Sequence, residues 1–443
     1  MTDHAAKEFS TIIRTDANPH NIQRVEKRIK ELYPHLSLLF LDFDSNTSEV
    51  NIYNRCRIFP TFVKNTTDMK TLILSCDMGG GHNSAAKALA QWGERNGIPC
   101  EIADTLSFIS TDFSRTMSDL YIFTTKSNLI KVIYKTGEIV PRSRRVKSPV
   151  YVANKIYCKR LCDHILEGGF TSVICTHVFP AEAMTALRRA GLLPSGLRTV
   201  FVQTDYDALT LMKDLEVDAI VIPHPHLIEE CVAIGARRDL LHPFGIPVSE
   251  ECWKHVEKSA AREECAALFS GSGHIGISAG WYLIMSGSMG FGKTGELIRT
   301  ILEAEGCGVE ILAVCGSNTK LRNRLCKDFG ENANVHPIGF TDRVPLLMDA
   351  CDVLFTKPGG LSSTEAAAKR IPLIHTAPIP GCETDNARFF HYHGMSYSTT
   401  DTAQQAAVAR RLCSDKKFRE GMTAAQAANT FPDTSEQIFN LLG

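Results

Sequence analysis

Two glycine-rich loops carry the strongest chemical signal in the chain. The first lies in residues 72–82, LILSCDMGGGH, and the second in residues 283–293, LIMSGSMGFGK. Each follows a short apolar run and precedes an amphipathic stretch, an order that predicts strand, loop and helix. Such a loop leaves backbone N–H groups free at a helix N-terminus, where they hold anions such as phosphate. A duplicated anion-binding unit is therefore predicted, although two short strands can also resemble each other by chance.

The second loop also fits a nucleotide-hydrolase motif. Residues 287–294, GSMGFGKT, match the phosphate-binding loop pattern G-x-x-x-x-G-K-T. A hydrolase of that type also needs an acid at the end of a later apolar strand to hold Mg²⁺. The apolar runs after Thr294 end in Cys315-Gly316 and in Thr356 instead. A P-loop nucleotide hydrolase therefore stays open as an alternative function.

A third predicted anion site lies further along the chain. In residues 353–366, VLFTKPGGLSSTEA, an apolar run leads into Pro-Gly-Gly and a Ser/Thr-rich helix start. The carboxylate of Glu365 would lie in the first turn of that helix, where it can accept hydrogen bonds from a pair of ligand hydroxyls. A capping box is the local alternative, in which Ser362 and Glu365 satisfy the helix's own N–H groups. The local sequence leaves both interpretations open.

The elements that must position these loops alternate between strand and helix. Strands are expected at 71–75, 171–175, 198–202, 217–222, 281–285, 309–314, 352–355 and 372–375, with helical stretches between them. This alternation predicts parallel doubly wound sheets. We predict an α/β fold with two Rossmann-like domains, residues 70–247 and 248–443, that face each other across a cleft. Residues 1–69 would form a small α+β extension of unknown role, in which the acids of Asp42-Phe43-Asp44 are structural.

Composition is that of an ordinary soluble globular protein. Of 443 residues 44% are hydrophobic and 22% charged, and the formal net charge is −1. The fifteen cysteines include no Cys-x-x-Cys pair, which predicts a reducing cytoplasmic compartment and no disulfide framework. We expect no signal peptide and no membrane span. Nucleic acid is not an expected partner because no recognised binding module is present.

One segment breaks this even charge distribution. Residues 126–160 carry ten basic residues and one acid, Glu138, with apolar residues interleaved. Such a segment suits an anionic membrane surface, at roughly 1 kcal/mol per Lys or Arg near the bilayer. A solvated loop with a core-facing stripe explains the composition equally well.

Several of these motifs together resemble a known family of glycosyltransferases. The family holds bacterial diacylglycerol glucosyltransferases, plant monogalactosyldiacylglycerol synthases and, more distantly, the peptidoglycan N-acetylglucosaminyltransferase MurG. Residues 356–366 and 380–386, PGCETDN, are similar to the family's Thr-Lys-Pro-Gly-Gly…Glu-Ala and Pro-Gly-Gln-Glu…Asn stretches. Residues 77–82 resemble its N-terminal glycine loop, and the resemblance spans about residues 70–443. Residues 204–206, 223–224 and 245–248 also follow its pattern.

The resemblance implies a GT-B fold with an inverting, metal-independent reaction. A hexose would pass from a UDP-sugar, UDP-glucose or UDP-galactose, to a lipid acceptor such as diacylglycerol. The donor would bind the C-terminal half and the acceptor the N-terminal half, at the inner face of the membrane. No metal or other cofactor is expected, and the oligomeric state is unknown. A catalytically weakened UDP-sugar sensor, docked on a membrane or a protein partner, is a further alternative.

The reaction requires a base for the acceptor hydroxyl and stabilisation of the charge that develops on UDP. We assign the base to His82, because an imidazole at the edge of the glycine loop titrates near neutrality. A helix-start histidine without chemistry is the alternative. Asp77 and Asp205 are second candidates, either orienting the imidazole or acting as the base. The acceptor-side loop residues are Gly79, Gly80 and Gly81.

The donor-binding residues that the resemblance implies lie in the C-terminal half. Glu365 would hold the ribose hydroxyls, the backbone of Phe340 the uracil edge, and Glu383 and Asn386 would face the sugar. The backbones of 287–292 and 359–363 would hold the diphosphate. The full set is Gly287, Ser288, Met289, Gly290, Phe340, Lys357, Gly359, Gly360, Leu361, Ser362, Glu365, Glu383 and Asn386.

Three residues depart from the family's sequence pattern, and two histidine pairs lie outside it. Cys382 stands where the family usually has Gln, and Ser288 and Met289 stand where many relatives have Gly and Glu. The pairs His224-Pro-His226 and His391-Tyr-His393 each lack a third metal ligand at useful spacing. We therefore expect both pairs to be turn and helix residues.

Overall fold

The computed structural model describes residues 41–44, 49–52, 69–76, 80–108, 149–269, 275–285, 293–379 and 381–443. The chain divides into two compact units, Met1–Phe62 and Val63–Gly443. The described part of the first unit is an antiparallel pair of strands, β1 (Leu41–Asp44) and β2 (Glu49–Ile52). Asp42 and Asp44 lie within β1.

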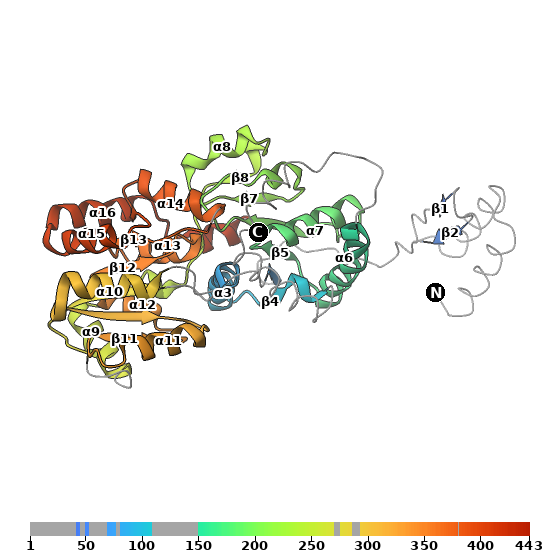
Figure 1. Ribbon diagram of the computed structural model, residues 1–443. Helices are drawn as coiled ribbons and strands as arrows, with labels where there is room; N and C mark the ends of the chain where they lie inside the picture. The colour runs from blue at the N-terminus through green and yellow to red at the C-terminus, as the bar shows by residue number, and fades with distance from the viewer. Residues whose placement is uncertain are drawn as a thin grey trace, which may run out of the picture. The chain divides into compact units, whose positions relative to one another are not determined.

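The first parallel sheet of the second unit has six strands in the order β4-β3-β5-β6-β7-β8 (Figure 1). Its strands are β3 (Thr71–Ser75), β4 (Cys100–Asp104), β5 (Ser172–Cys175), β6 (Arg198–Val202), β7 (Ala219–Val221) and β8 (Leu241–His242). Its helices are α3 (Gly80–Arg95), α6 (Pro149–Gly168), α7 (Val178–Arg189) and α8 (Ile228–Ala233). Short 3₁₀ turns, among them η4 (Pro225–Leu227), lie between these elements.

The second parallel sheet also has six strands, in the order β11-β10-β9-β12-β13-β14. Its strands are β9 (Gly280–Met285), β10 (Val309–Val314), β11 (Val335–Ile338), β12 (Val353–Thr356), β13 (Leu373–His375) and β14 (Tyr397–Ser398). Its helices are α9 (Lys258–Leu268), α10 (Thr294–Glu305), α11 (Thr319–Phe329), α12 (Val344–Ala350), α13 (Gly360–Ala368) and α14 (Cys382–Tyr392). The chain ends in α15 (Thr402–Ser414), α16 (Lys416–Ala428) and α17 (Thr434–Asn440).

The central strands of both sheets are buried on both faces. All residues of β3, β5, β10 and β12 are buried, as expected of parallel strands that helices cover on both sides. These two sheets with their helices confirm the predicted α/β fold with two doubly wound domains. The last helix, α17, packs against α3 beside the first sheet. The ring centroids of Phe439 in α17 and Trp92 in α3 lie 5.0 Å apart in a stacked arrangement.

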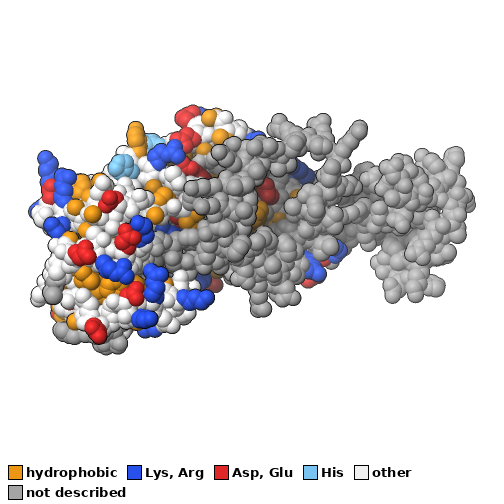
Figure 2. All heavy atoms as spheres, viewed as in Figure 1, with side chains coloured by type: hydrophobic (Ala, Val, Ile, Leu, Met, Phe, Trp, Pro, Cys, Tyr) orange, Lys and Arg blue, Asp and Glu red, His pale blue; other side chains and the backbone are white. Residues whose placement is uncertain are grey.

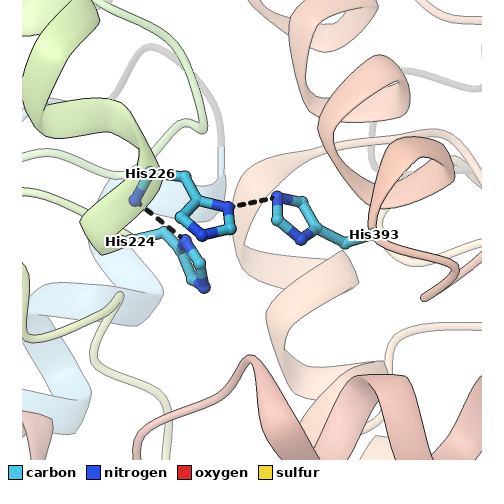
Figure 3. Close-up of side chains that lie close together, drawn as sticks. All are labelled: His224, His226 and His393. Carbon is cyan, nitrogen blue, oxygen red and sulfur yellow. Dashed lines mark hydrogen bonds between the residues drawn. The ribbon is translucent and has the colours of Figure 1, made fainter.

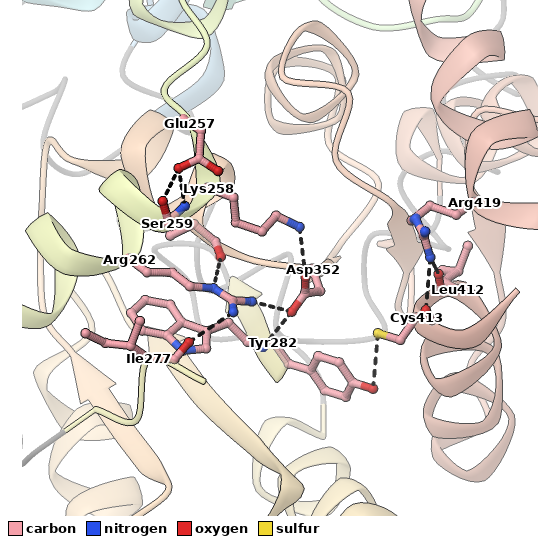
Figure 4. A network of polar contacts seen from close by, with 12 residues as sticks. Glu257, Lys258, Ser259, Arg262, Ile277, Tyr282, Asp352, Leu412, Cys413 and Arg419 are labelled. Atoms are coloured by element: carbon pink, nitrogen blue, oxygen red, sulfur yellow. Dashed lines mark hydrogen bonds and ion pairs between the residues drawn. The ribbon is translucent and has the colours of Figure 1, made fainter. Parts of the chain in front are cut away.

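Asp352 fixes the start of β12 (Figure 4). Its carboxylate accepts hydrogen bonds from Arg262 Nη2 at 2.6 Å and from Lys258 Nζ at 2.8 Å, both on α9. It also accepts the backbone N–H of Trp281 in β9, at 2.8 Å. Since β12 leads directly into the Pro-Gly-Gly loop, this network holds the strand that positions the predicted donor site.

The helices that the structure describes include no membrane span, and the face seen in Figure 2 mixes the two charges. Within the described ranges, no helix combines the length and apolar character that crossing a bilayer requires. On the face viewed in Figure 2, Lys and Arg side chains are interspersed with Asp and Glu. Most of the predicted basic segment, residues 126–148, lies outside the described residues.

Candidate active site where the two halves meet

The first glycine loop and the Pro-Gly-Gly loop lead to helices that touch each other. Helix α3 follows β3, and helix α13 follows β12, so both helices begin at the carboxyl ends of parallel strands, where α/β sheets bind ligands. A Cβ atom at Gly81 would lie 3.6 Å from Leu361 Cδ2. At Gly360 a Cβ atom would lie 1.9 Å from the carbonyl oxygen of Thr204. Only glycine permits this close approach of α13 to the loop after β6.

His82, in the first turn of α3, is oriented by two oxygen atoms. Its Nδ1 lies 2.9 Å from the carbonyl oxygen of Thr176 and 2.9 Å from Thr204 Oγ1. Because a carbonyl oxygen only accepts, Nδ1 carries the proton in this bond, and Nε2 keeps the lone pair. Burial lowers the pKa of His82, and the bond to Thr176 partly opposes this. The imidazole is therefore neutral at pH 7 with Nε2 available as a base.

Asp205 and Asn386 are hydrogen-bonded to each other, although Asp205 was predicted to act on the acceptor and Asn386 to face the donor sugar. Asn386 Nδ2 donates to Asp205 Oδ1 at 2.7 Å and to the carbonyl oxygen of Pro358 at 3.0 Å. Asn386 Oδ1 accepts the backbone N–H of Tyr206 at 2.6 Å. In this arrangement the amide of Asn386 joins α14 to the loop after β6. Burial raises the pKa of Asp205 to about 6, although the bond from Asn386 opposes the shift.

Lys357 and Glu383 form a buried ion pair beside the same loops. The distance from Lys357 Nζ to Glu383 Oε1 is 2.5 Å, and the side chains are 22% and 7% exposed. Glu383 Oε2 also accepts the backbone N–H of Ile379 at 2.7 Å. The pair places one cation at the end of β12 and one carboxylate in the first turn of α14.

The capping-box interpretation of Glu365 is wrong. The N-cap of α13 is Gly359 and makes no side-chain hydrogen bond, so Ser362 lies inside the helix. Glu365 lies in the second turn of α13, not in the first turn as predicted. Among the described residues the carboxylate of Glu365 has no hydrogen-bond partner, and burial raises its pKa to about 7. A half-buried carboxylate without a partner is available to a ligand that offers hydrogen-bond donors.

Several predicted residues lie apart from this cluster or outside the described ranges. Asp77, Gly79, Gly287, Ser288, Met289 and Gly290 are outside the described residues. Gly80 is exposed at the start of α3, and Phe340, which follows β11, is 81% exposed. Cys382 begins α14, and burial together with the charge of Asp205 raises the pKa of its thiol.

The P-loop lysine is turned toward its own helix. Lys293 Nζ lies 3.0 Å from Glu296 Oε1, and the Lys293 side chain is 68% exposed. In a phosphate-binding loop this lysine reaches the β- and γ-phosphates.

Sequence reasoning missed two groups of residues. Thr176 and the hydroxyl of Thr204 orient His82, although neither had been assigned a role there. The histidine pairs lie at a turn and at the end of a helix, as predicted, but sequence spacing did not show that His393 lies beside His224 and His226. His224, His226 and His393 each offer a ring nitrogen, and these atoms lie within 4.8 Å of one another.

Comparisons with known proteins support the resemblance. Residues 82–248 match the model of the monogalactosyldiacylglycerol (MGDG) synthase family. The processive diacylglycerol beta-glucosyltransferase of Staphylococcus carnosus is 27% identical over 228 residues, which are 52% of this chain and 56% of that enzyme. The enzyme of the same name from Bacillus licheniformis is 25% identical over 359 residues, 80% of this chain and 89% of that enzyme. The predicted resemblance to this glycosyltransferase family is thereby confirmed.

Solved structures support the fold. Acinetobacter baumannii MurG has a TM-score of 0.52 at 13% identity, covering 84% of this chain and 99% of that chain. Anabaena Alr3699/HepE, crystallised with UDP and glucose, has a TM-score of 0.51 at 13% identity, covering 84% and 98%. At this identity the likeness concerns the fold, and it confirms the predicted GT-B type.

Proposed function

We propose that this chain, a relative of the processive diacylglycerol beta-glucosyltransferases, is a glycosyltransferase that moves a hexose from a UDP-sugar to a lipid acceptor. The observation that carries the proposal is the contact between α3 and α13, which brings the oriented imidazole of His82 next to the helix of Glu365. The names of the relatives favour diacylglycerol as acceptor. The UDP and glucose in HepE favour UDP-glucose, with UDP-galactose as the second choice because of the MGDG synthase match.

The proton of the acceptor hydroxyl would pass to Nε2 of His82 as the hydroxyl oxygen attacks the anomeric carbon. The bond between that carbon and the UDP oxygen breaks on the opposite face, so the configuration inverts. The resulting imidazolium keeps its Nδ1–H bond to the carbonyl oxygen of Thr176, which holds the ring in place and stabilises its charge. Asp205 is the second candidate, although its carboxylate is already bonded to Asn386.

The departing diphosphate would be stabilised without a metal ion. The first turn of a helix presents N–H groups that lack intrahelical partners. In α13 the N–H of Gly360 bonds to the carboxylate of Asp205, so the diphosphate would meet the N–H groups of Leu361 and Ser362. Lys357 adds a positive charge at the same end of β12. Glu365 would accept hydrogen bonds from the ribose hydroxyls.

The function is tested by incubating the purified chain with radiolabelled UDP-sugars and mixed lipids. We expect a labelled glycolipid whose formation continues in EDTA, because the diphosphate is held by helix N–H groups and Lys357. Hydrolysis of the UDP-sugar without glycolipid, or binding without turnover, would favour the sensor. Mg²⁺-dependent hydrolysis of ATP or GTP without sugar transfer would favour the P-loop alternative.

We further propose that residues 126–160 attach the protein to the inner face of an anionic membrane. Changing Arg142, Arg144, Arg145 and Lys147 to Glu should release the protein from anionic vesicles in a sedimentation assay, because each basic residue contributes roughly 1 kcal/mol near the bilayer. Wild-type binding should also weaken with salt.

Helix α11 offers a matched control for this change. It carries four exposed basic residues, Lys320, Arg322, Arg324 and Lys327. Changing these four to Glu alters the net charge equally and should leave vesicle binding nearly intact. Equal loss in both variants would assign binding to net charge alone, and no loss in the first would remove the segment's membrane role.

A further inference from the structure

We propose that His224, His226 and His393 form a binding site for a divalent transition-metal ion, of which Zn²⁺ fits best (Figure 3). The site is distinct from the predicted donor and acceptor residues and does not depend on the proposed transfer reaction. His224 and His226 lie at the start of η4, after β7, and His393 caps the C-terminus of α14. The three side chains thus come from both halves of the second unit.

The spacing of the ring nitrogens suits a tetrahedral ion. His226 Nδ1 lies 3.2 Å from His393 Nε2. Two nitrogen ligands at about 2.0–2.1 Å from a tetrahedral zinc ion lie roughly 3.3 Å apart. The pair therefore already has the separation that the ion requires. One ring nitrogen of each of the three histidines lies within 4.8 Å of the other two.

Asn429 fixes the tautomer of His224 that a metal needs. Asn429 Nδ2 donates to the carbonyl oxygen of Ala425 at 2.7 Å, which identifies the other amide atom, Oδ1, as the acceptor facing His224. His224 Nε2, 3.0 Å from that oxygen, must carry the proton. Nδ1 of His224 then has the lone pair. A hydrogen bond from the outer ring nitrogen to an oxygen is the usual support of a metal-binding histidine.

Binding an ion requires one proton to move. His226 Nδ1 and His393 Nε2 are hydrogen-bonded to each other, so one of them carries the proton in this structure. That proton must shift to the other nitrogen of its ring before both atoms can bind the ion. His224 Nδ1 would give up a long 3.2 Å bond from the His226 N–H.

The site opens to a pocket that can supply the fourth ligand. The pocket measures about 610 Å³ and is lined by His226, His393, Tyr206, Asp207, Glu230 and Asp385, among others. A water molecule from the pocket can complete a tetrahedral set. An ion held by the turn around η4 in one half and the C-terminus of α14 in the other would brace α14, which contains Glu383 and Asn386.

The proposal is tested on the full chain, stripped of metal with a chelator and then titrated with Co²⁺ and Zn²⁺. We expect one equivalent of Co²⁺ with visible absorption typical of nitrogen ligands, displacement by Zn²⁺, and a rise in Tm. His226→Ala and His393→Ala should each weaken binding at least tenfold and abolish the rise in Tm. The Tm of each metal-free variant, compared with the metal-free wild type, shows whether it still folds.

His391→Ala is the matched control. His391 is exposed on the same helix, beside Tyr397, and its removal should leave metal binding unchanged. Cys326→Ser/Cys413→Ser removes the two cysteines that are exposed among the described residues and should likewise have no effect. Absence of stoichiometric binding, equal binding by wild type and the two histidine variants, or loss of binding in the cysteine variant would overturn the proposal.

Discussion

His82→Ala is expected to lower kcat for sugar transfer by about 10² to 10⁴ while UDP affinity stays nearly unchanged. The structure gives the reason for the split. Nδ1 of His82 is committed to Thr176 and Thr204, so Nε2 is the basic atom, and His82 lies on α3, whereas the predicted nucleotide residues lie beyond residue 280. Single-turnover transfer and UDP titration calorimetry measure the two quantities separately. His164→Ala, in the same half and bonded to Glu101, serves as the control.

The pH profile distinguishes His82 from Asp205. The neutral imidazole is the active form, so the rate should fall as pH decreases through the pKa of His82, which burial places below its ordinary 6.5. Removing His82 should remove this decline from the residual activity. A decline near pH 6 that persists in His82→Ala and disappears in Asp205→Asn would identify Asp205, whose pKa is raised to about 6. Near-full turnover in His82→Ala would leave Asp205 or Asp77 as the base.

Sequence predicts best those strands that are buried on both faces. β3, β5, β6, β9 and β10 each contain an apolar run of at least three residues, because helices cover both faces of a parallel sheet. β4, CEIAD, lies at the edge of the sheet and is partly exposed. Its charged and apolar residues are mixed and do not form the pattern by which a strand is predicted. β8 and β14 are two-residue strands at sheet edges. Their existence depends on the neighbouring strand, which local sequence does not contain.

The site shows the same division between local and long-range information. The glycines of the TKPGG stretch could be predicted as a loop, but the partner that forbids a side chain at Gly360 is Thr204, far away in sequence. Asn386 is 181 residues from Asp205, its hydrogen-bond partner. Sequence spacing likewise reveals a possible pair of metal ligands two residues apart. It does not reveal that His226 lies beside His393, which is 167 residues later in the chain.

Glu365→Ala is expected to weaken UDP-sugar binding by about two orders of magnitude or more. It would remove two charge-assisted hydrogen bonds to the ribose hydroxyls, each contributing roughly 1.5–3 kcal/mol. Helix α13 should remain intact, because its cap is Gly359 and the carboxylate bonds to no described residue. Titration calorimetry with UDP gives the affinity, and circular dichroism verifies the fold.

The protonation state of Glu365 gives this prediction a second readout. Burial raises its pKa to about 7, and the carboxylate is the form that accepts two hydroxyl hydrogen bonds. UDP affinity of the wild type should therefore decrease as pH falls below about 7, and Glu365→Gln should abolish this dependence. Lys293→Ala discriminates the P-loop alternative, which requires that lysine for nucleotide binding, whereas the transferase needs Glu365. Unchanged UDP affinity in Glu365→Ala would mean that the ribose is held elsewhere.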